Sequence, residues 1–212
     1  MTVYRVKGLN PHAGQKKVLE EAGRFNLVAG GRRSGKTMLA LKIVTETVFD
    51  GKGCALVFPN KGMMEYAFKS LSKSLRQVTG GMKNIGALKE IRLVTGGTIK
   101  FYLAEKFEPM ALRGRIFHAV LIEEAAMLGV RLKKIHKLAS EVTEIFDGKV
   151  YLLSTPRYGS HFNKMFLKQR TKWKKFHLSV WDNPFFNKAQ IDELKATMSE
   201  FAFKQEIEGV AF

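Results

Sequence analysis

A glycine-rich segment near the N-terminus carries the residues whose types and spacing predict chemistry. Residues 30–37 read GGRRSGKT, which matches the phosphate-binding pattern G-x-x-x-x-G-K-[ST]. Glycines let the backbone wrap closely around a phosphate chain with its N–H groups pointing inward. Lys36 places a positive charge near the terminal phosphates, and the Thr37 hydroxyl suits Mg²⁺. The alternative is a basic turn without a ligand. We predict ATP and Mg²⁺ binding by Gly30, Gly31, Arg32, Arg33, Ser34, Gly35, Lys36 and Thr37.

Two adjacent carboxylates follow an apolar strand-like run at residues 118–122. A strand that ends in two acids downstream of a phosphate-binding loop is typical of a Walker B segment. We expect Glu123 to support Mg²⁺ through its water shell and Glu124 to orient, or accept a proton from, the attacking water. Glu123 stands where most such ATPases carry Asp. The alternative is the ordinary preference for acids at a helix N-terminus.

Small hydroxyl residues end another apolar run, at residues 149–153. Ser154 and Thr155 precede Pro156, and their hydroxyls suit a hydrogen bond to the γ-phosphate or to the catalytic carboxylate. Thr155 is therefore a further candidate for nucleotide binding. A strand end followed by a proline turn is the alternative.

The elements that must position these residues alternate along the chain. Strand-like apolar runs followed by longer helical patterns predict an α/β fold with a mostly parallel central sheet flanked by helices. A Gly-Gly pair at 96–97, between apolar runs 91–94 and 98–103, predicts a β-hairpin. Other strands are expected at 25–29, 54–58, 117–122, 149–153 and 176–180, and helices at 36–49, 63–78 and 189–208.

The charge predicts a polyanionic partner. The 212 residues contain 36 Lys and Arg against 19 Asp and Glu, a net charge of +17, which favours nucleic acid without choosing between DNA, RNA and an acidic membrane surface. The 45% hydrophobic content excludes a disordered basic tail. No apolar run reaches the ~20 residues of a membrane span, and no signal region is evident, so we expect a soluble cytoplasmic protein. Cys54 stands alone, which excludes an internal disulfide.

Three basic clusters are candidates for contact with phosphates, although each is also typical of a solvated face. Lys69, Lys73 and Arg76 are spaced to share one face of the expected helix 63–78. Residues 148–181 contain no Asp or Glu, and we expect Phe162 and Trp173 there to lie in the core. The remaining cluster members are Arg131, Lys133, Lys134 and Lys137, and, within 148–181, Lys149, Arg157, Lys164, Lys168, Arg170, Lys172, Lys174 and Lys175.

Taken together, these motifs resemble the ATPase domain of large terminase subunits, the DNA-packaging motors of tailed bacteriophages and herpesviruses. The resemblance extends over nearly the whole chain. Near the glycine-rich loop, the resemblance lies in residues 11–15 ahead of it and in Arg32 and Arg33 within it. Further along, it lies in residues 112–114 before the acidic pair and in residues 154–156 with Gly159 and Phe162. Towards the C-terminus, it lies in residues 182–184 and in residues 203–206 with Gly209 and Phe212.

This resemblance implies a P-loop NTPase of the RecA/ASCE-like class that hydrolyses ATP to move double-stranded DNA into a procapsid. It implies that Gln15 reads adenine, with an ordinary surface amide as the alternative. It implies that Arg113 acts on the site of a neighbouring subunit, with a structural arginine that caps the following strand as the alternative. For Arg32 and Arg33, anion attraction and a sensor role in the same chain both stay open. The implied partners are a portal protein and a small terminase subunit, without a membrane. The implied assembly is a homo-oligomeric ring, commonly a pentamer, with a monomer in isolation as the other state, in the cytoplasm of the infected host cell.

The resemblance also implies a division of the chain. Residues 1–180 are expected to form the ATPase core, and residues 181–212 a helical lid or linker leading to a nuclease domain. The acids after residue 181 are scattered, so no nuclease activity is expected from this chain. Either the sequence is an excised ATPase domain or the nuclease resides elsewhere.

Two other functions fit the same residues. A DNA helicase or translocase of a related P-loop class would normally carry a second RecA-like domain, for which 212 residues leave no room. A non-hydrolysing basic nucleic-acid-binding protein would carry a degenerate loop and show no ATP-dependent behaviour. Strand displacement distinguishes the first from a packaging motor, and phosphate release dependent on Lys36 excludes the second.

Overall fold

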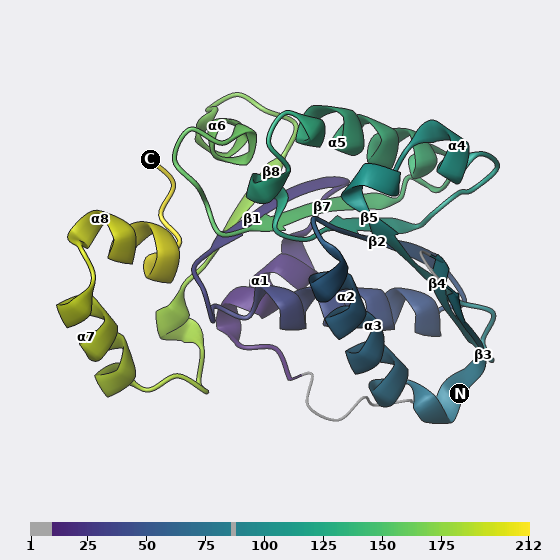
Figure 1. Cartoon of the computed structure of the whole chain (residues 1–212), viewed down its shortest axis with the longest axis horizontal. Coiled ribbons are helices and arrows are strands. Elements are labelled where there is room, and N and C mark those ends of the chain that lie inside the picture. Colours follow the sequence, from purple (N-terminus) through teal and green to yellow (C-terminus); the bar gives the residue numbers. More distant parts are fainter. Residues whose placement is uncertain (1–9, 86–87) are drawn as a thin grey trace.

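The described residues, 10–85 and 88–212 of the computed structural model, are organised around a mostly parallel sheet in the order β3-β4-β5-β2-β6-β7-β1-β8 (Figure 1). The strands from β5 to β8 in this order are mutually parallel, and β4 runs antiparallel to β3 and β5. The strands are β1 (Phe25–Gly30), β2 (Gly53–Phe58), β3 (Thr79–Ile85), β4 (Leu88–Leu93), β5 (Thr98–Leu103), β6 (Ala119–Ile122), β7 (Lys149–Ser154) and β8 (Lys174–Leu178).

Helices cover both faces of the sheet, and a separate hydrophobic core lies between each face and its helices (Figure 1). The lower layer consists of α1 (Ala13–Glu21), α2 (Lys36–Phe49) and α3 (Lys61–Ser74), and the upper layer of α4 (Pro109–Leu112), α5 (Arg131–Val142) and α6 (His161–Leu167). Because both faces are covered, central strands such as β6 are apolar at every position. Phe162 and Trp173 lie in the upper core, as predicted. The α/β fold class predicted from the sequence is confirmed.

The predicted hairpin extends the sheet at one edge. Its strands β4 and β5 pair antiparallel, and Gly96 adopts a φ of 89° in the turn. β5 also pairs with β2, so the hairpin is continuous with the parallel strands. The sequence did not predict β3, because Gly80 and Gly81 interrupt its apolar pattern. The two glycines coincide with a register shift in the β3–β4 pairing.

Several predicted boundaries are wrong. The helix expected at 63–78 ends at Ser74, and Arg76 lies in the separate 3₁₀ turn Arg76–Val78 rather than on the helical face of Lys69 and Lys73. The last strand lies at 174–178 instead of 176–180. The helix expected at 189–208 is broken where Ser199 caps a new helix by accepting a hydrogen bond from the Ala202 N–H (3.3 Å).

The broken helix forms a small C-terminal group beside the carboxyl ends of the strands, yellow in Figure 1. Its elements are α7 (Lys188–Thr197), α8 (Glu200–Phe203) and the π turn η6 (Lys204–Glu208). A separate core of Val180, Ile191, Phe203 and Ile207 holds them together. The division at residue 180 stays a prediction, and its residues 1–9 lie outside the described part. Among the described helices, none combines the length and the apolarity needed for a membrane crossing.

The C-terminal group meets the glycine-rich loop backbone to backbone. A Cβ atom on Gly31 would lie 1.7 Å from the Ile207 carbonyl oxygen, and one on Gly209, which has a φ of 73°, 2.2 Å from the Gly31 nitrogen. Only glycines allow this approach, because real Cβ atoms do not come within 3.0 Å of backbone. The Arg32 N–H also donates to the Glu206 carbonyl (2.6 Å).

We predict that Gly31→Ala separates the loop from the C-terminal group. The clash with backbone should lower the free energy of unfolding by about 1–3 kcal/mol, the usual cost of overpacking, measured by urea denaturation. The control is Gly81→Ala, because no atom lies within 4 Å of that Cβ and its φ is not positive. Equal stability of the two variants would contradict the close contact.

Candidate functional site

The glycine-rich loop joins β1 to α2 at the carboxyl edge of the sheet. Arg33 and Gly35 adopt positive φ angles of 63° and 90°, which turn the chain back on itself. Gly35 is the N-cap of α2, so the free N–H groups and the positive dipole end of this 14-residue helix face the loop. The loop therefore presents backbone N–H groups of the kind that bind anions, and its role in binding phosphates stays a prediction.

Lys36 lies at the centre of the site and is only 7% exposed. Its Nζ donates to the carbonyl oxygens of Gly30 (2.8 Å) and Gly31 (2.9 Å) and to Thr155 Oγ1 (3.1 Å). These contacts use all three donors of the ammonium group. Burial lowers the pKa of Lys36, while Glu124, whose Oε1 lies 4.0 Å from Nζ, acts in the opposite direction.

The two carboxylates after β6 have different environments. Glu123 is 4% exposed, and its Oε1 is buried without a hydrogen-bond partner among the described residues. Burial, followed by the charge of Glu124, raises the pKa of Glu123 to about 7. Glu124 adopts a left-handed φ of 45°, and its Oε2 lies 3.4 Å from both Ser154 Oγ and the Thr155 nitrogen. Strained backbone of this kind is common at active sites.

These residues fit a Mg²⁺ ion held mainly through phosphates and water. The described part of the chain contains no group of three or more His, Cys, Asp or Glu side chains able to hold a metal by themselves. Thr37 is exposed on the first turn of α2, and the unpartnered Glu123 oxygen suits a hydrogen bond from a water molecule. Mg²⁺ ordinarily keeps several waters when it binds with a nucleotide.

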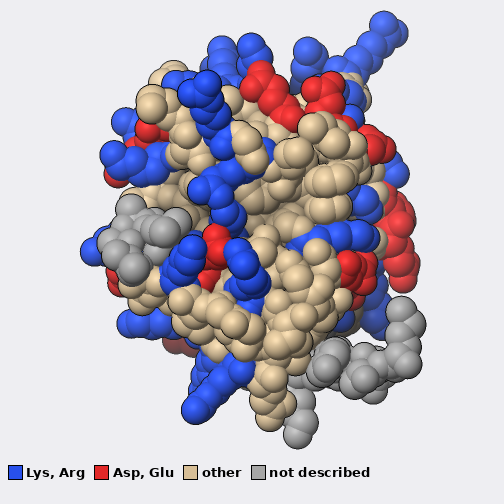
Figure 2. Space-filling view, turned by 90° about the vertical axis from the view of Figure 1, so that its right-hand side faces the viewer, with Lys and Arg blue, Asp and Glu red and all other residues tan. Residues whose placement is uncertain are grey.

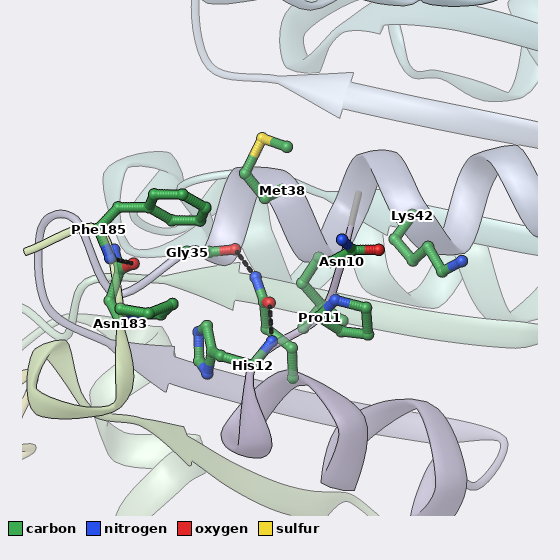
Figure 3. Close-up of a pocket in the computed structure, with 11 residues that line it drawn as sticks. Asn10, Pro11, His12, Gly35, Met38, Lys42, Asn183 and Phe185 are labelled. Atoms are coloured by element: carbon green, nitrogen blue, oxygen red, sulfur yellow. Dashed lines mark hydrogen bonds between the residues drawn. The ribbon is translucent and has the colours of Figure 1, made fainter. Parts of the chain in front are cut away.

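A pocket of about 70 Å³ lies beside the loop, with apolar walls that include Met38 and Phe185 (Figure 3). Gln15 lines it, and the structure shows that its amide already has two backbone partners. Its Nε2 donates to the Gly35 carbonyl (2.8 Å), and its Oε1 accepts from the His12 N–H (2.9 Å). One N–H and one lone pair of the amide remain for a base. The adenine-reading role of Gln15 stays a prediction.

The two arginines of the loop contact the C-terminal group rather than the anion site. Arg32 Nε lies 3.0 Å from Glu206 Oε2, and the Arg33 guanidinium lies 4.8 Å from the centre of the Phe186 ring. Asn183 Nδ2 donates to the Arg33 carbonyl (2.5 Å). These partners were not predicted as site residues, although Asn183 and Glu206 lie in two of the segments that resemble terminases.

No protein-family model matches the chain. By sequence it is 25% identical over 223 residues to the large terminase subunit of Escherichia phage T5, a match that covers 95% of this chain and 48% of that protein. By structure it matches the large terminase ATPase domain of Thermus phage P74-26 with a TM-score of 0.71 and 20% identity, over 95% of this chain and 94% of that one. The chain has the fold of a phage large terminase ATPase domain.

The predicted resemblance to large terminases is thus confirmed. The large terminase of a thermophilic bacteriophage, solved in complex with ADP, matches with a TM-score of 0.72 and 17% identity, over 94% of this chain and 53% of that one. The same thermophilic terminase has also been solved with ATP-gamma-S. The chain spans about half the length of the T5 terminase.

Within this terminase ATPase fold, Arg113 follows α4, which lies in the upper layer at the end of the molecule opposite the C-terminal group that contacts the loop (Figure 1). It is the exposed C-cap of α4, and the chain continues from it to the start of β6 at Ala119. The glycine-rich loop follows the carboxyl end of β1. The amino ends of the parallel strands, including the start of β6, lie at the opposite edge of the sheet. The structure therefore does not bring Arg113 to the loop of its own chain, which leaves a neighbour's site or a structural role.

We predict that Glu123→Gln changes how stability depends on pH. The folded-state pKa of about 7 lies above the ordinary value of 4.5, so the folded protein holds this proton more tightly and loses stability as pH rises between these values. The variant lacks this loss. Between pH 5 and pH 8 its free energy of unfolding, relative to that of the natural chain, should therefore rise by about 2–3 kcal/mol.

The measurement is urea unfolding in EDTA at the two pH values. Exposed Glu105→Gln is the control and should follow the natural chain. A Glu123→Gln profile parallel to that of the natural chain would show that the carboxyl group is ionised throughout this range.

Proposed function

We propose that this chain is the ATPase motor domain of a phage large terminase, which hydrolyses ATP to translocate double-stranded DNA into a procapsid. The observation that carries the proposal is the meeting of Lys36, Glu124 and Thr155 at the carboxyl edge of a sheet with the terminase ATPase fold. Three segments distant in sequence supply a cation, a carboxylate and a hydroxyl around one anion site. That combination suits phosphoryl transfer to water.

Binding relies on groups already directed at the site. The loop N–H groups and the N-terminus of α2 favour the phosphate chain. With nucleotide bound, the ammonium of Lys36 would leave the Gly30 and Gly31 carbonyls for the terminal phosphates, and the Thr37 hydroxyl would hold the metal ion. When bound, Mg²⁺ neutralises charge on the phosphates. Met38 and Phe185 provide apolar surface for the base, and Gln15 is the candidate for reading adenine.

Hydrolysis requires a water molecule in line with the γ-phosphate. Glu124 orients this water or accepts its proton, and the Thr155 N–H donates to its carboxylate, with Ser154 Oγ at the same distance of 3.4 Å. Glu123, whose buried Oε1 has no partner among the described residues, would accept a hydrogen bond from a water molecule bound to the metal ion. Arg113 of a neighbouring subunit neutralises charge developing on the transferring group. A homo-oligomeric ring, commonly a pentamer, would supply this arginine. The partners would be a portal protein and a small terminase subunit, in the cytoplasm of the infected host cell.

We predict that substitutions of Lys36 and Glu124 differ in their effect on nucleotide binding. Lys36→Ala should abolish ATP hydrolysis and weaken nucleotide binding, because it removes charge from the anion site. Glu124→Gln should lower the turnover rate by about 10²–10⁴-fold, the usual contribution of a general base, while nucleotide binding is retained. The assays are phosphate release and displacement of a fluorescent ADP analogue, with exposed Lys69→Ala and Glu105→Gln as controls. Undiminished hydrolysis by Glu124→Gln under saturating ATP would exclude its proposed role.

We predict that Arg113→Ala and Glu124→Gln chains complement each other. Each variant alone should be inactive under conditions where the natural chain assembles. In an equal mixture, one site in four pairs an intact Glu124 with an intact neighbouring Arg113, so about a quarter of the natural activity should return. Absence of recovery in mixed assemblies, verified by co-purification of differently tagged chains, would assign Arg113 a structural role.

A further inference from the structure

The upper helical layer carries exposed positive charges, all but one of which form no ion pair with the described residues. Within residues 10–85 and 88–212, the one ion pair formed by this set joins Lys137 to Glu141, at 4.0 Å. We call the set the α5–α6 basic surface. Its members are exposed and comprise Arg131, Lys133, Lys134 and Lys137 on α5, with Lys164, Lys168, Arg170 and Lys172 on and just after α6.

Two clusters that are separate in the sequence form one surface in space. The His136 ring of α5 lies 6.2 Å from the His161 ring of α6, stacked at 10°, and meets the Trp173 ring edge-on. Burial lowers the pKa of both imidazoles. The charge of Lys172 lowers the pKa of His136 further, and the charges of Lys133 and Lys164 lower that of His161. Positive charges from α5 and α6 therefore surround one point.

The helix on the opposite side of the sheet is a weaker candidate. Lys61 of α3 pairs with Glu65 at 3.8 Å, and Arg76 lies outside the helix, which leaves Lys69 and Lys73 on its exposed side. Figure 2, which views the molecule from the right of Figure 1, shows Lys and Arg side chains dispersed over that end and projecting from its upper rim. Charge alone is widespread, so position relative to the catalytic residues must distinguish the clusters.

The α5–α6 basic surface is connected directly to the catalytic segments. Glu124 is followed by the 3₁₀ turn η3 (Ala125–Leu128) and then by α5, while Thr155 is followed by a short loop and α6. Both helices pack against η3, and the Ala126 N–H donates to Ser154 Oγ (3.0 Å). Glu124 and Thr155 each lie close in the chain to the start of one of these helices, so a movement of either residue during hydrolysis would act on that helix.

We infer that the α5–α6 basic surface contacts the phosphate backbone of duplex DNA. The inference rests on the proposed function and assigns its DNA contact to one surface. Lysine side chains on a helix face bind phosphates without reading bases, as a motor that moves any sequence requires. Each contact also releases counterions, so the binding is sensitive to salt.

The test compares two triple variants with the same change in net charge. Lys133→Gln, Lys134→Gln and Lys164→Gln alter the proposed surface, and Lys61→Gln, Lys69→Gln and Lys73→Gln alter α3. Binding of a fluorescent duplex is measured by anisotropy across a salt series without nucleotide. The α5–α6 variant should bind at least ~10-fold more weakly, with a salt slope reduced by roughly 2–3, because each lost phosphate contact contributes about 0.9. The α3 variant should remain within about twofold of the natural chain, as expected for charges that do not touch phosphate.

Several outcomes would overturn the inference. They are equal losses in both variants, no loss in the α5–α6 variant, or binding to phosphatidylserine vesicles but not to the duplex. Thermal melting of each variant verifies that it is folded, and the single change Lys133→Gln, expected to lower the slope by about 0.9, replaces the triple if that fails to fold. Phosphate release that depends on Lys36 is scored separately, so failure of the ATPase proposal is distinguishable from failure of this surface.

Discussion

Burial of the Lys36 ammonium is the constraint on which the rest of the site depends. A charge this far from water is tolerated only if every N–H finds a partner, and here two carbonyls and the Thr155 hydroxyl supply them. Those partners come from the loop after β1 and from the end of β7, which pair in the sheet. The register of these strands therefore determines whether the lysine can be buried at all. The Glu124 carboxylate adds a compensating negative charge at the rim.

The elements that carry Lys36 and Glu124 could be predicted from the sequence because their signals are local. A strand, a glycine-rich turn and a helix start within residues 25–37, and two acids follow a strand at Glu123 and Glu124. Each motif carries its own secondary-structure context. Parallel strands then bring their carboxyl ends together without further information. That is why the α/β class and the meeting of Lys36 with Glu124 were predictable.

The remaining features depend on contacts that short motifs do not encode. The Gln15 amide looked free in the sequence but bonds to Gly35, and Glu206 reaches Arg32 from the far end of the chain. β3 was not predicted because Gly80 and Gly81 interrupt its apolar pattern, and the strand depends on pairing with β4. α5 was also not predicted, although its buried Leu132, Ile135 and Leu138 have helical spacing.

The separation of Arg113 from the loop determines how copies of the chain would have to meet. An arginine that leaves the amino edge of one sheet to enter the carboxyl edge of another joins two unlike surfaces. Such a head-to-tail contact differs from a two-fold dimer, in which like surfaces meet, and it continues until it closes into a ring or grows as a filament. Each chain would then be donor on one side and acceptor on the other, so a subunit that lacks both Arg113 and Glu124 would disable two consecutive sites.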